Sequence, residues 1–330
     1  MRVLFRWVKE EVPGPHWLGL FRRAWPAYER WFLTEGEAGR PDLETCRRHL
    51  RAHMPELVPM WERLAELSGG DDRAGRMLAL YCPPPYLTGC TQAVWTKGAP
   101  FLARNYDYHP EACEGLFLMS NWHGTKVIAA SDCLWGALDG MNEHGLTAAL
   151  SFGGSRVVGR GFGIPLILRY VLEFSRTVDE AVEVLAKVPS HMAYNVSLLD
   201  HSGAFGVAHV RPDQRTELVR EPVSTNHQHR REWEEYTRRT RSRERKNVLL
   251  RKLRTDAFTR EALQDFFLRS PIYVTDYSSG HGTLYTAVYC PQEGSADFVW
   301  PGFRATRSFD SFVDAEIVVP FHSNRVDREG

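Results

Sequence analysis

Hydrophobic periodicity divides the chain into a helical N-terminal part and a strand-rich remainder. In the first part, apolar residues recur at three- and four-residue spacing with charged residues between them, which is typical of amphipathic helices. Helices are predicted near residues 17–32, 43–53, 56–67 and 72–81, and Pro26 should kink or split the first. Aromatic residues on a helical face usually serve packing, so this segment is expected to cover a sheet.

Beyond this helical part, the pattern changes to strands bounded by turn signals. Strands are predicted at residues 91–96, 100–106, 115–120, 126–131, 146–152, 194–199, 205–211, 284–290, 297–300 and 313–320. Asp139-Gly140 and residues 143–145 are interpreted as turns, and residues 200–203 turn the clearest hairpin.

Further helices are expected among and after these strands, at residues 164–174, 177–187, 230–254 and 260–268. Thr177 and Glu180 form a capping box at the start of the second of these helices. The charged helix over 230–254 is interpreted as a solvated, salt-bridged helix rather than a nucleic-acid-binding arm, because acidic residues dilute its basic ones. With no regular β-α alternation, the order of elements favours an α+β layered sandwich over a parallel doubly wound sheet.

Composition and charge limit the kinds of binding partner that the sequence suggests. Lys+Arg and Asp+Glu both number 41, so nothing favours nucleic acid or an anionic membrane. No run of about 18 apolar residues suggests a membrane span. The first residues carry charges too close together for a signal peptide, so a cytoplasmic protein is expected. The six cysteines include no C-x-x-C pair and match no zinc pattern, which predicts free thiols, each most simply a small buried side chain.

One cysteine stands apart because of its neighbours. Cys90 follows Gly89 and a proline run at 83–85, and it opens the predicted strand over 91–96. The next predicted strand carries Arg104 and Asp107 toward its far end. A thiol at the start of one strand and charged residues at the end of its neighbour can meet at one sheet edge, which is a workable geometry for a supported nucleophile.

Cleavage of the Gly89–Cys90 bond would give this thiol its own base. A free thiol has a pKa of about 8.5, and an α-amino group titrates near about 7.7–8.0, so the amine of Cys90 could accept the thiol proton. Arg104 could lower the thiol pKa and Asp107 could hold the amine. The alternative is that Arg104 and Asp107 form a surface ion pair of little energetic value.

A thiol that attacks a carbonyl needs an oxyanion site. Asn226 is the best side-chain donor, and the backbone N–H groups around Ser151 and Phe152 are a second candidate. The alternative for Asn226 is an Asx turn that caps the following charged helix. His227 and His229 stand two residues apart with no third ligand nearby, so no metal or other cofactor is expected.

At these residues the chain resembles the acyl-coenzyme A:6-aminopenicillanate acyltransferase-like family of cysteine N-terminal-nucleophile hydrolases. The similarity covers about residues 80 to 300, and its pieces occur in the family's order. They are Gly89-Cys90-Thr91, residues 104–107, residues 139–146, the helix over 177–189, the hairpin over 194–209 and Thr225-Asn226-His227. Bile salt hydrolases, which are more distant, carry a later arginine in the site, and no match to it is found near residues 278–282.

The resemblance implies a four-layer αββα sandwich and autocatalytic cleavage before Cys90. Residues 1–89 would then be a helical propeptide or retained chain, and residues 90–330 the catalytic domain. By the same resemblance, Cys90 is the nucleophile, Arg104 and Asp107 are its charged partners, and Asn226 is the oxyanion donor. Residues 139–142 would be a structural turn near the site. The implied reaction is hydrolysis or acyl transfer at a linear amide or thioester of a small molecule.

Two other hypotheses keep the same fold. In one, the chain is not cut and Cys90 works with a histidine such as His123 or His227. In the other, the protein binds acyl groups without catalysis. Aromatic side chains, with Tyr108 and Phe162 as the substrate-binding candidates, suggest an apolar acyl site but are equally compatible with a core. The substrate itself, hydrolysis as against transfer, and the oligomeric state are not readable from the sequence.

Overall fold

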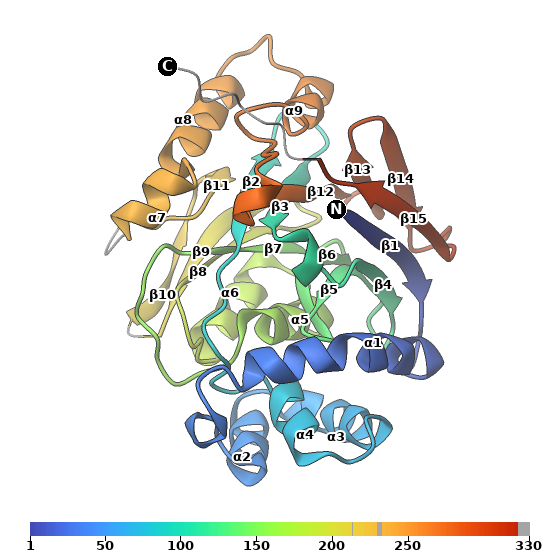
Figure 1. Cartoon of the computed structure of the whole chain (residues 1–330). Coiled ribbons are helices and arrows are strands. Elements are labelled where there is room, and N and C mark those ends of the chain that lie inside the picture. The colour runs from blue at the N-terminus through green and yellow to red at the C-terminus, as the bar shows by residue number, and fades with distance from the viewer. Residues whose placement is uncertain (213, 230–232, 323–330) are drawn as a thin grey trace.

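The computed structural model describes residues 1–212, 214–229 and 233–322, and it places two β-sheets face to face with helices outside them (Figure 1). The larger sheet has nine strands in the order β10-β9-β8-β7-β6-β5-β4-β1-β15. These strands are β1 (Arg2–Lys9), β4 (Leu116–Ser120), β5 (Val127–Asp132), β6 (Gly136–Asn142), β7 (Thr147–Phe152), β8 (Tyr194–Leu199), β9 (Phe205–Arg211), β10 (Gln214–Val219) and β15 (Ala315–Pro320). Neighbours are antiparallel except β1 and β4, which are parallel.

The smaller sheet carries the candidate nucleophile. Its six strands lie in the order β11-β2-β3-β12-β13-β14 and all pair antiparallel. They are β2 (Gly89–Trp95), β3 (Phe101–Tyr108), β11 (Val223–Ser224), β12 (Gly282–Cys290), β13 (Ser295–Trp300) and β14 (Phe303–Ser308). The β2–β3 register places Gly89 opposite Asp107 and Cys90 opposite Tyr106. The start of β2 therefore meets the end of β3 at one edge, as the sequence predicts.

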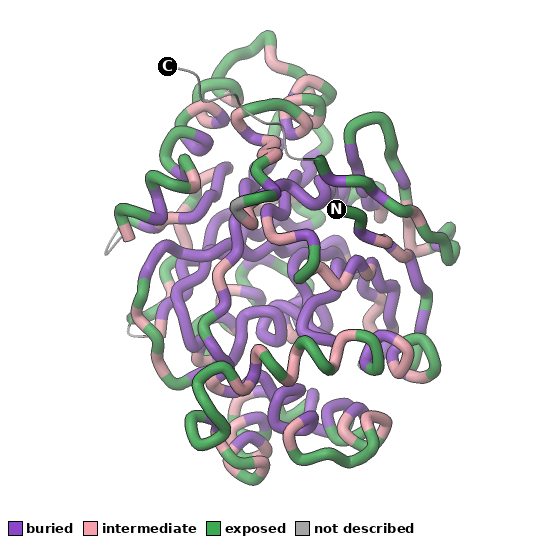
Figure 2. The backbone as a smooth tube through the Cα atoms, in the orientation of Figure 1, coloured by how far each residue is buried: buried purple, intermediate pink, exposed green. Residues whose placement is uncertain are grey.

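Helices cover the outer faces of both sheets. The helices α5 (Ile164–Phe174) and α6 (Val178–Lys187) pack on the nine-stranded sheet. On the other side, α8 (Ser242–Leu253) and α9 (Arg260–Phe266) bury Leu249 and Leu263 against Phe101 of the six-stranded sheet. The central strands of both sheets are buried while the outward helix faces are exposed (Figure 2). This arrangement confirms the α+β class and the four-layer αββα sandwich.

The predicted N-terminal helices are present beside this sandwich. They are α1 (Pro15–Phe32), α2 (Leu43–His53), α3 (Val58–Leu67) and α4 (Asp72–Leu78). Short 3₁₀ helices occupy Glu37–Gly39, Pro55–Leu57, Pro110–Ala112 and Tyr277–Ser279. The expected split of the first helix is wrong, because α1 continues through Pro26 as one helix. No helix within the described ranges is long and apolar enough to cross a bilayer.

The first nine residues correct the prediction of a wholly helical N-terminal part. Arg2–Lys9 among them form β1, an inner strand of the nine-stranded sheet, between β4 and β15. Val3, Phe5 and Trp7 are buried in alternation, which is the two-residue period of a strand. The N-terminal part of the chain is thus built into the large sheet as well as lying on it.

The Asp139-Gly140 turn is a second incorrect prediction, because both residues lie inside β6. A Cβ placed on Gly140 would lie 2.7 Å from the carbonyl oxygen of Ile128 and 2.9 Å from Leu172 of α5. The glycine therefore permits close packing between α5 and the sheet. Asp139 is fully buried as an ion-pair partner. The turn lies just beyond β6, where Gly145 takes a positive φ of 83°.

The remaining differences concern sheet edges and the charged helix. The sequence pattern missed β10 and β14, since both carry many exposed residues and show weak apolar alternation. The helix predicted over 230–254 is two helices, α7 (Glu234–Arg239) and α8, separated where Arg241 takes a left-handed conformation (φ 50°). Residues 230–232 of that prediction lie outside the described residues.

An acidic pair, the buried Asp132 and the half-buried Glu114, ties the N-terminal segment to the large sheet. The hydroxyl of Tyr28 in α1 donates to Glu114 (2.5 Å) and lies 3.2 Å from Asp132. Tyr86, just upstream of β2, donates to the other oxygen of Asp132 (2.5 Å). Burial, and then the charge of Asp132, raise the pKa of Glu114 to about 7, and burial raises the pKa of Asp132.

This acidic pair predicts a falling stability as the pH rises. The folded chain holds the Glu114 proton more tightly than the unfolded chain, so the stability is fully present below pH 4.5 and is lost as the pH rises to about 7. The replacement Glu114→Gln should remove about 3 kcal/mol of the pH dependence of the unfolding free energy. Urea unfolding at a series of pH values measures it. Glu56→Gln is the control, because Glu56 accepts from Tyr170 (2.7 Å) on the exposed surface, and an equal effect there would contradict the assignment.

Candidate active site

Cys90 is held at both its sulfur and its nitrogen. Its side chain is fully buried in the uncut chain, at the start of β2. Arg104 of β3 donates to the sulfur from Nη2 at 3.2 Å, and the backbone N–H of Cys90 donates to Oδ1 of Asn226 at 3.1 Å. The hydroxyl of Thr88 lies 3.6 Å from the sulfur. The structure thus brings Arg104 and Asn226, two of the predicted site residues, into contact with this cysteine.

The Arg104 guanidinium is anchored by a carboxylate from the opposite sheet. It forms an ion pair with Asp139 of β6, and both side chains are fully buried. Tyr285 of β12 accepts from Arg104 (3.1 Å) and donates to Asp139 (2.6 Å), while Tyr289 donates to the other Asp139 oxygen. Burial by itself lowers the pKa of Arg104, but the Cys90 sulfur and Tyr285 raise it, and the net shift is upward. A fixed positive charge therefore lies against the thiol.

Asp107 has a different partner from the one that the sequence suggested. It is buried and accepts from Thr283 of β12 (2.7 Å) and from Arg245 of α8 (3.2 Å). Burial raises its pKa, and Arg245 and Thr283 oppose that shift only in part. The alternative of a surface ion pair between Arg104 and Asp107 is wrong, because each is buried and each pairs with another residue.

Arg245 joins the parts of this site and was missed by sequence reasoning. It donates to the Cys90 carbonyl (3.0 Å), the Thr91 hydroxyl, Asp107 and Oδ1 of Asn226 (2.8 Å). Its helix was interpreted as solvated, yet the Arg245 side chain is buried. The available signal was helical spacing, because residues 242, 245 and 249 share the buried face of α8.

Asn226 is aimed at Cys90 and does not cap a helix. While Oδ1 accepts from the Cys90 and Arg245 donors, Nδ2 donates to the Thr88 carbonyl at 3.0 Å. The backbone N–H of Asn226 donates to the Ser242 hydroxyl at 2.8 Å. The Asx-turn alternative is therefore wrong, because the side-chain amide of Asn226 bonds to Cys90 at the start of β2 and to Thr88 just before it.

Comparison with known proteins identifies the family of this chain. A family model described as acyl-coenzyme A:6-aminopenicillanic acid acyl-transferase matches residues 94–305, which is more than half of the chain. The chain belongs to this family. The match begins just after Cys90 and includes Arg104, Asp107, Asn226 and Arg245. No curated protein matches the chain significantly.

Solved structures similar to this acyl-transferase family member share little sequence with it. A mutant of conjugated bile acid hydrolase from Clostridium perfringens is 13% identical with a TM-score of 0.49, covering 72% of this chain and 100% of its own. Penicillin V acylase from Agrobacterium tumefaciens is 19% identical with a TM-score of 0.47, and the match covers 66% of this chain and 84% of the acylase. A Caenorhabditis elegans orthologue of N-acylethanolamine-hydrolyzing acid amidase is 16% identical with a TM-score of 0.47, and the match covers 70% of this chain and 100% of the orthologue. Membership in the acyl-transferase family rests on the family match.

Ser151 and Phe152, the second predicted source of oxyanion donors, have different side-chain surroundings. Ser151 donates from its hydroxyl to the Thr225 carbonyl (2.9 Å) and so supports the segment that carries Asn226. Phe152 packs edge-on against Tyr236, with ring centres 5.1 Å apart. The oxyanion role of the Ser151 and Phe152 backbone N–H groups stays a prediction.

The two aromatic candidates for substrate binding also stay predictions. Tyr108 stacks on Tyr106, the residue opposite Cys90, with ring centres 5.7 Å apart. Phe162 is fully buried against Tyr81 and His53 of the N-terminal segment (5.1 and 6.1 Å). Tyr108 thus contacts a strand neighbour of Cys90, whereas Phe162 contacts the N-terminal segment.

The two histidines weighed as partners of Cys90 are engaged elsewhere. His123 contacts Glu173 of α5 through Nδ1. His227 contacts the Ser242 hydroxyl (2.8 Å) and the Thr225 hydroxyl (3.2 Å), and burial lowers its pKa to about 4. These contacts favour a site in which the base is not an internal histidine.

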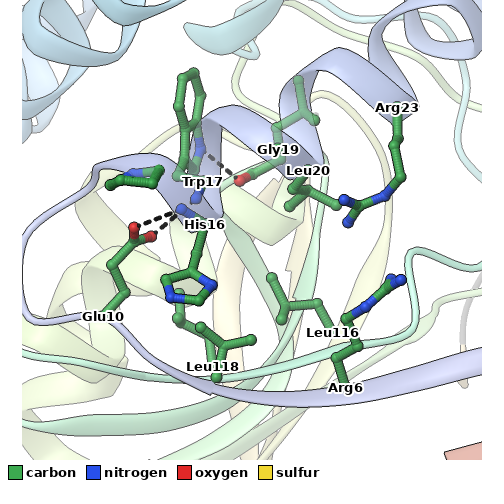
Figure 3. Close-up of a pocket in the computed structure, with 12 residues that line it drawn as sticks. Arg6, Glu10, His16, Trp17, Gly19, Leu20, Arg23, Leu116 and Leu118 are labelled. Atoms are coloured by element: carbon green, nitrogen blue, oxygen red, sulfur yellow. Dashed lines mark hydrogen bonds between the residues drawn. The ribbon is translucent and has the colours of Figure 1, made fainter. Parts of the chain in front are cut away.

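A cavity of about 180 Å³ lies away from this cluster, between α1 and the sheet (Figure 3). Glu10 accepts there from the backbone N–H groups of His16 (3.1 Å) and Trp17 (3.0 Å), in the first turn of α1. Leu20 forms part of its apolar wall. Because Cys90, Arg104, Asp107 and Asn226 do not line it, this cavity is separate from the candidate active site.

Proposed function

We propose that this chain is a cysteine N-terminal-nucleophile amidohydrolase or acyltransferase that acts on a linear amide or thioester through a thioester on Cys90. One observation carries the proposal. The sulfur of Cys90 contacts the Arg104 guanidinium (3.2 Å) while the nitrogen of the same residue contacts Oδ1 of Asn226 (3.1 Å). A structural cysteine in a strand needs neither contact, whereas a residue that supplies both nucleophile and base needs both.

The first proposed reaction is cleavage of the chain itself. The Cys90 sulfur attacks the Gly89 carbonyl carbon, the C–N bond breaks, and the thiol proton passes to the departing nitrogen, which becomes the α-amine. Water then hydrolyses the Gly89 thioester to a carboxylate and restores the thiol. The strand geometry supports a glycine here, because a Cβ on Gly89 would lie 3.0 Å from Cβ of Asp107 and 3.1 Å from its carbonyl oxygen.

Turnover of a substrate would repeat the same chemistry between two molecules. The α-amine of Cys90 accepts the thiol proton, and the thiolate attacks the acyl carbon while Arg104 stabilises the negative sulfur. An oxyanion forms and collapses, the amine returns the proton to the leaving group, and the acyl group stays on sulfur. Water or an acceptor amine then releases it. Asp107 and Arg245 hold the Cys90 segment in place throughout.

The N-terminal segment would remain bound after cleavage. Because β1 pairs with both β4 and β15, loss of residues 1–89 would break two rows of backbone hydrogen bonds in the large sheet. The hydrogen bonds from Tyr28 to Glu114 and Asp132 add a polar attachment. These contacts favour a retained chain over a discarded propeptide.

Mass spectrometry of the purified full chain tests both reactions. We expect two chains that co-elute in size-exclusion chromatography, with a new N-terminus reading Cys90-Thr91-Gln92. Incubation with p-nitrophenyl octanoate should place one acyl group on the Cys90 peptide. A whole chain that still acylates Cys90 would indicate a thiol hydrolase without self-cleavage, and a whole chain without acylation would leave only the acyl-binding alternative.

A further inference from the structure

The donors near Cys90 converge on one backbone oxygen. The carbonyl of Thr88 accepts from Nδ2 of Asn226 at 3.0 Å and from the hydroxyl of Tyr236 at 3.1 Å. Both donor side chains are buried, and they come from separate parts of the chain, the segment after β11 and helix α7. Two convergent donors around one carbonyl oxygen are the arrangement that stabilises an oxyanion.

The residue that carries this carbonyl also contacts the reacting sulfur. The Thr88 hydroxyl is 3.6 Å from the Cys90 sulfur, so Thr88 fills the space next to the thiol. The other end of the Asn226 amide, Oδ1, holds the Cys90 nitrogen at 3.1 Å. Once cleavage frees the end of the retained chain at Gly89, movement of Thr88 out of this position would leave Nδ2 in place, directed at the point that the Thr88 oxygen had occupied.

The Tyr236 hydroxyl is held ready to donate. Its ring packs against Phe152 (5.1 Å) and stacks on Trp233 (5.4 Å), which restrains its position. Burial raises the pKa of Tyr236, so the hydroxyl keeps its proton at neutral pH. When Thr88 departs, a buried donor is left without this acceptor, which is unfavourable until another oxygen takes the place.

We propose that the Tyr236 hydroxyl and Nδ2 of Asn226 together form the oxyanion site, and that the Thr88 carbonyl fills this site until cleavage releases it. The acyl oxygen of an amide or ester substrate then takes the position of the Thr88 oxygen. Tyr236 is thus a catalytic residue for turnover, and Thr88-Gly89 keeps the site closed in the uncut chain. This inference rests on the proposed function of Cys90.

Loss of the Tyr236 hydroxyl should affect substrate turnover much more than self-cleavage. In the uncut chain both donors are occupied by the Thr88 carbonyl, while self-cleavage develops its oxyanion on the neighbouring Gly89 carbonyl. Tyr236→Phe removes only the hydroxyl. It should lower kcat for p-nitrophenyl octanoate about 100-fold, with KM changed less than about threefold, because the donor acts mainly in the transition state. Self-cleavage, followed by intact mass, should slow by less than about tenfold.

Tyr194→Phe is the matched control. Tyr194 is also fully buried and also donates to an upstream backbone carbonyl, that of Tyr86, at 2.9 Å. Its variant should lose a similar amount of thermal stability and keep kcat. A wild-type kcat in Tyr236→Phe, or equal losses of kcat in the two variants, would overturn the inference.

Acylation of wild-type Cys90 is measured first in the same experiment. If wild type forms the acyl-enzyme and Tyr236→Phe forms it equally fast, the inference fails while the proposed function stands, and the backbone donors near Ser151 and Phe152 become the second oxyanion group. If wild type forms no acyl-enzyme, the proposed function itself fails.

Discussion

Replacement of Cys90 by alanine is expected to abolish both self-cleavage and turnover. The sulfur is the atom that attacks in both reactions, and no other group in the described contacts of Cys90 can replace it. Loss of a nucleophile in comparable triads lowers kcat by about 10⁶-fold, so activity should fall below detection. Intact mass should show one whole chain, and p-nitrophenyl octanoate should leave the Cys90-containing peptide unmodified.

Cys290→Ala provides a closely matched control for this prediction. Cys290 is also a buried strand cysteine of the six-stranded sheet, and its sulfur accepts from Arg260 at 3.1 Å. Burial raises its pKa to about 11, so its thiol stays protonated at neutral pH. The control variant should cleave and turn over normally. Activity retained in Cys90→Ala, or lost equally in Cys290→Ala, would show that the catalytic assignment is incorrect.

Replacement of Arg245 by methionine should destabilise the protein by about 3–5 kcal/mol, because it leaves the buried Asp107 carboxylate without its cation. The carbonyl of Cys90 and Oδ1 of Asn226 lose a donor at the same time. We expect self-cleavage and turnover to fall as well, since these atoms position the nucleophile. Denaturant unfolding at constant pH measures the loss of stability.

The pH dependence of this variant gives a second readout. Without Arg245 the folded-state pKa of Asp107, already raised by burial, should rise further. The folded protein then holds a proton that the unfolded chain releases, so stability falls as the pH increases. Arg245→Met should therefore be more destabilising at pH 8 than at pH 5, and Asp107→Asn in the same chain should remove that difference.

Arg251→Met is the control for Arg245, because Arg251 is exposed on the same helix. An exposed substitution of this kind should change the unfolding free energy by less than about 0.5 kcal/mol. If both variants lose the same stability, the effect belongs to helix α8 in general and not to the ion pair with Asp107.

Much of the site was predictable because its residues stand close together in sequence or at strand ends. Cys90, Arg104 and Asp107 lie on two consecutive strands, and antiparallel pairing of neighbours brings their ends together. Asn226 was predicted because it follows a strand-like stretch and Pro222, which places it at a strand end. By contrast, Asp139 was read as part of a turn, since Asp-Gly is a common turn pair and its buried partner Arg104 lies on the other sheet.

The sequence by itself determined the α+β class, most helices and strands, and the candidate nucleophile with its neighbours, because these depend on local periodicity and on adjacent strands. Only the tertiary structure placed β1 in the large sheet, paired Arg104 with Asp139, and brought Arg245 to Cys90 and Tyr236 to Thr88. Those contacts join residues that lie far apart in the sequence. No local pattern specifies them, since they form only when the two sheets and α7 and α8 pack together.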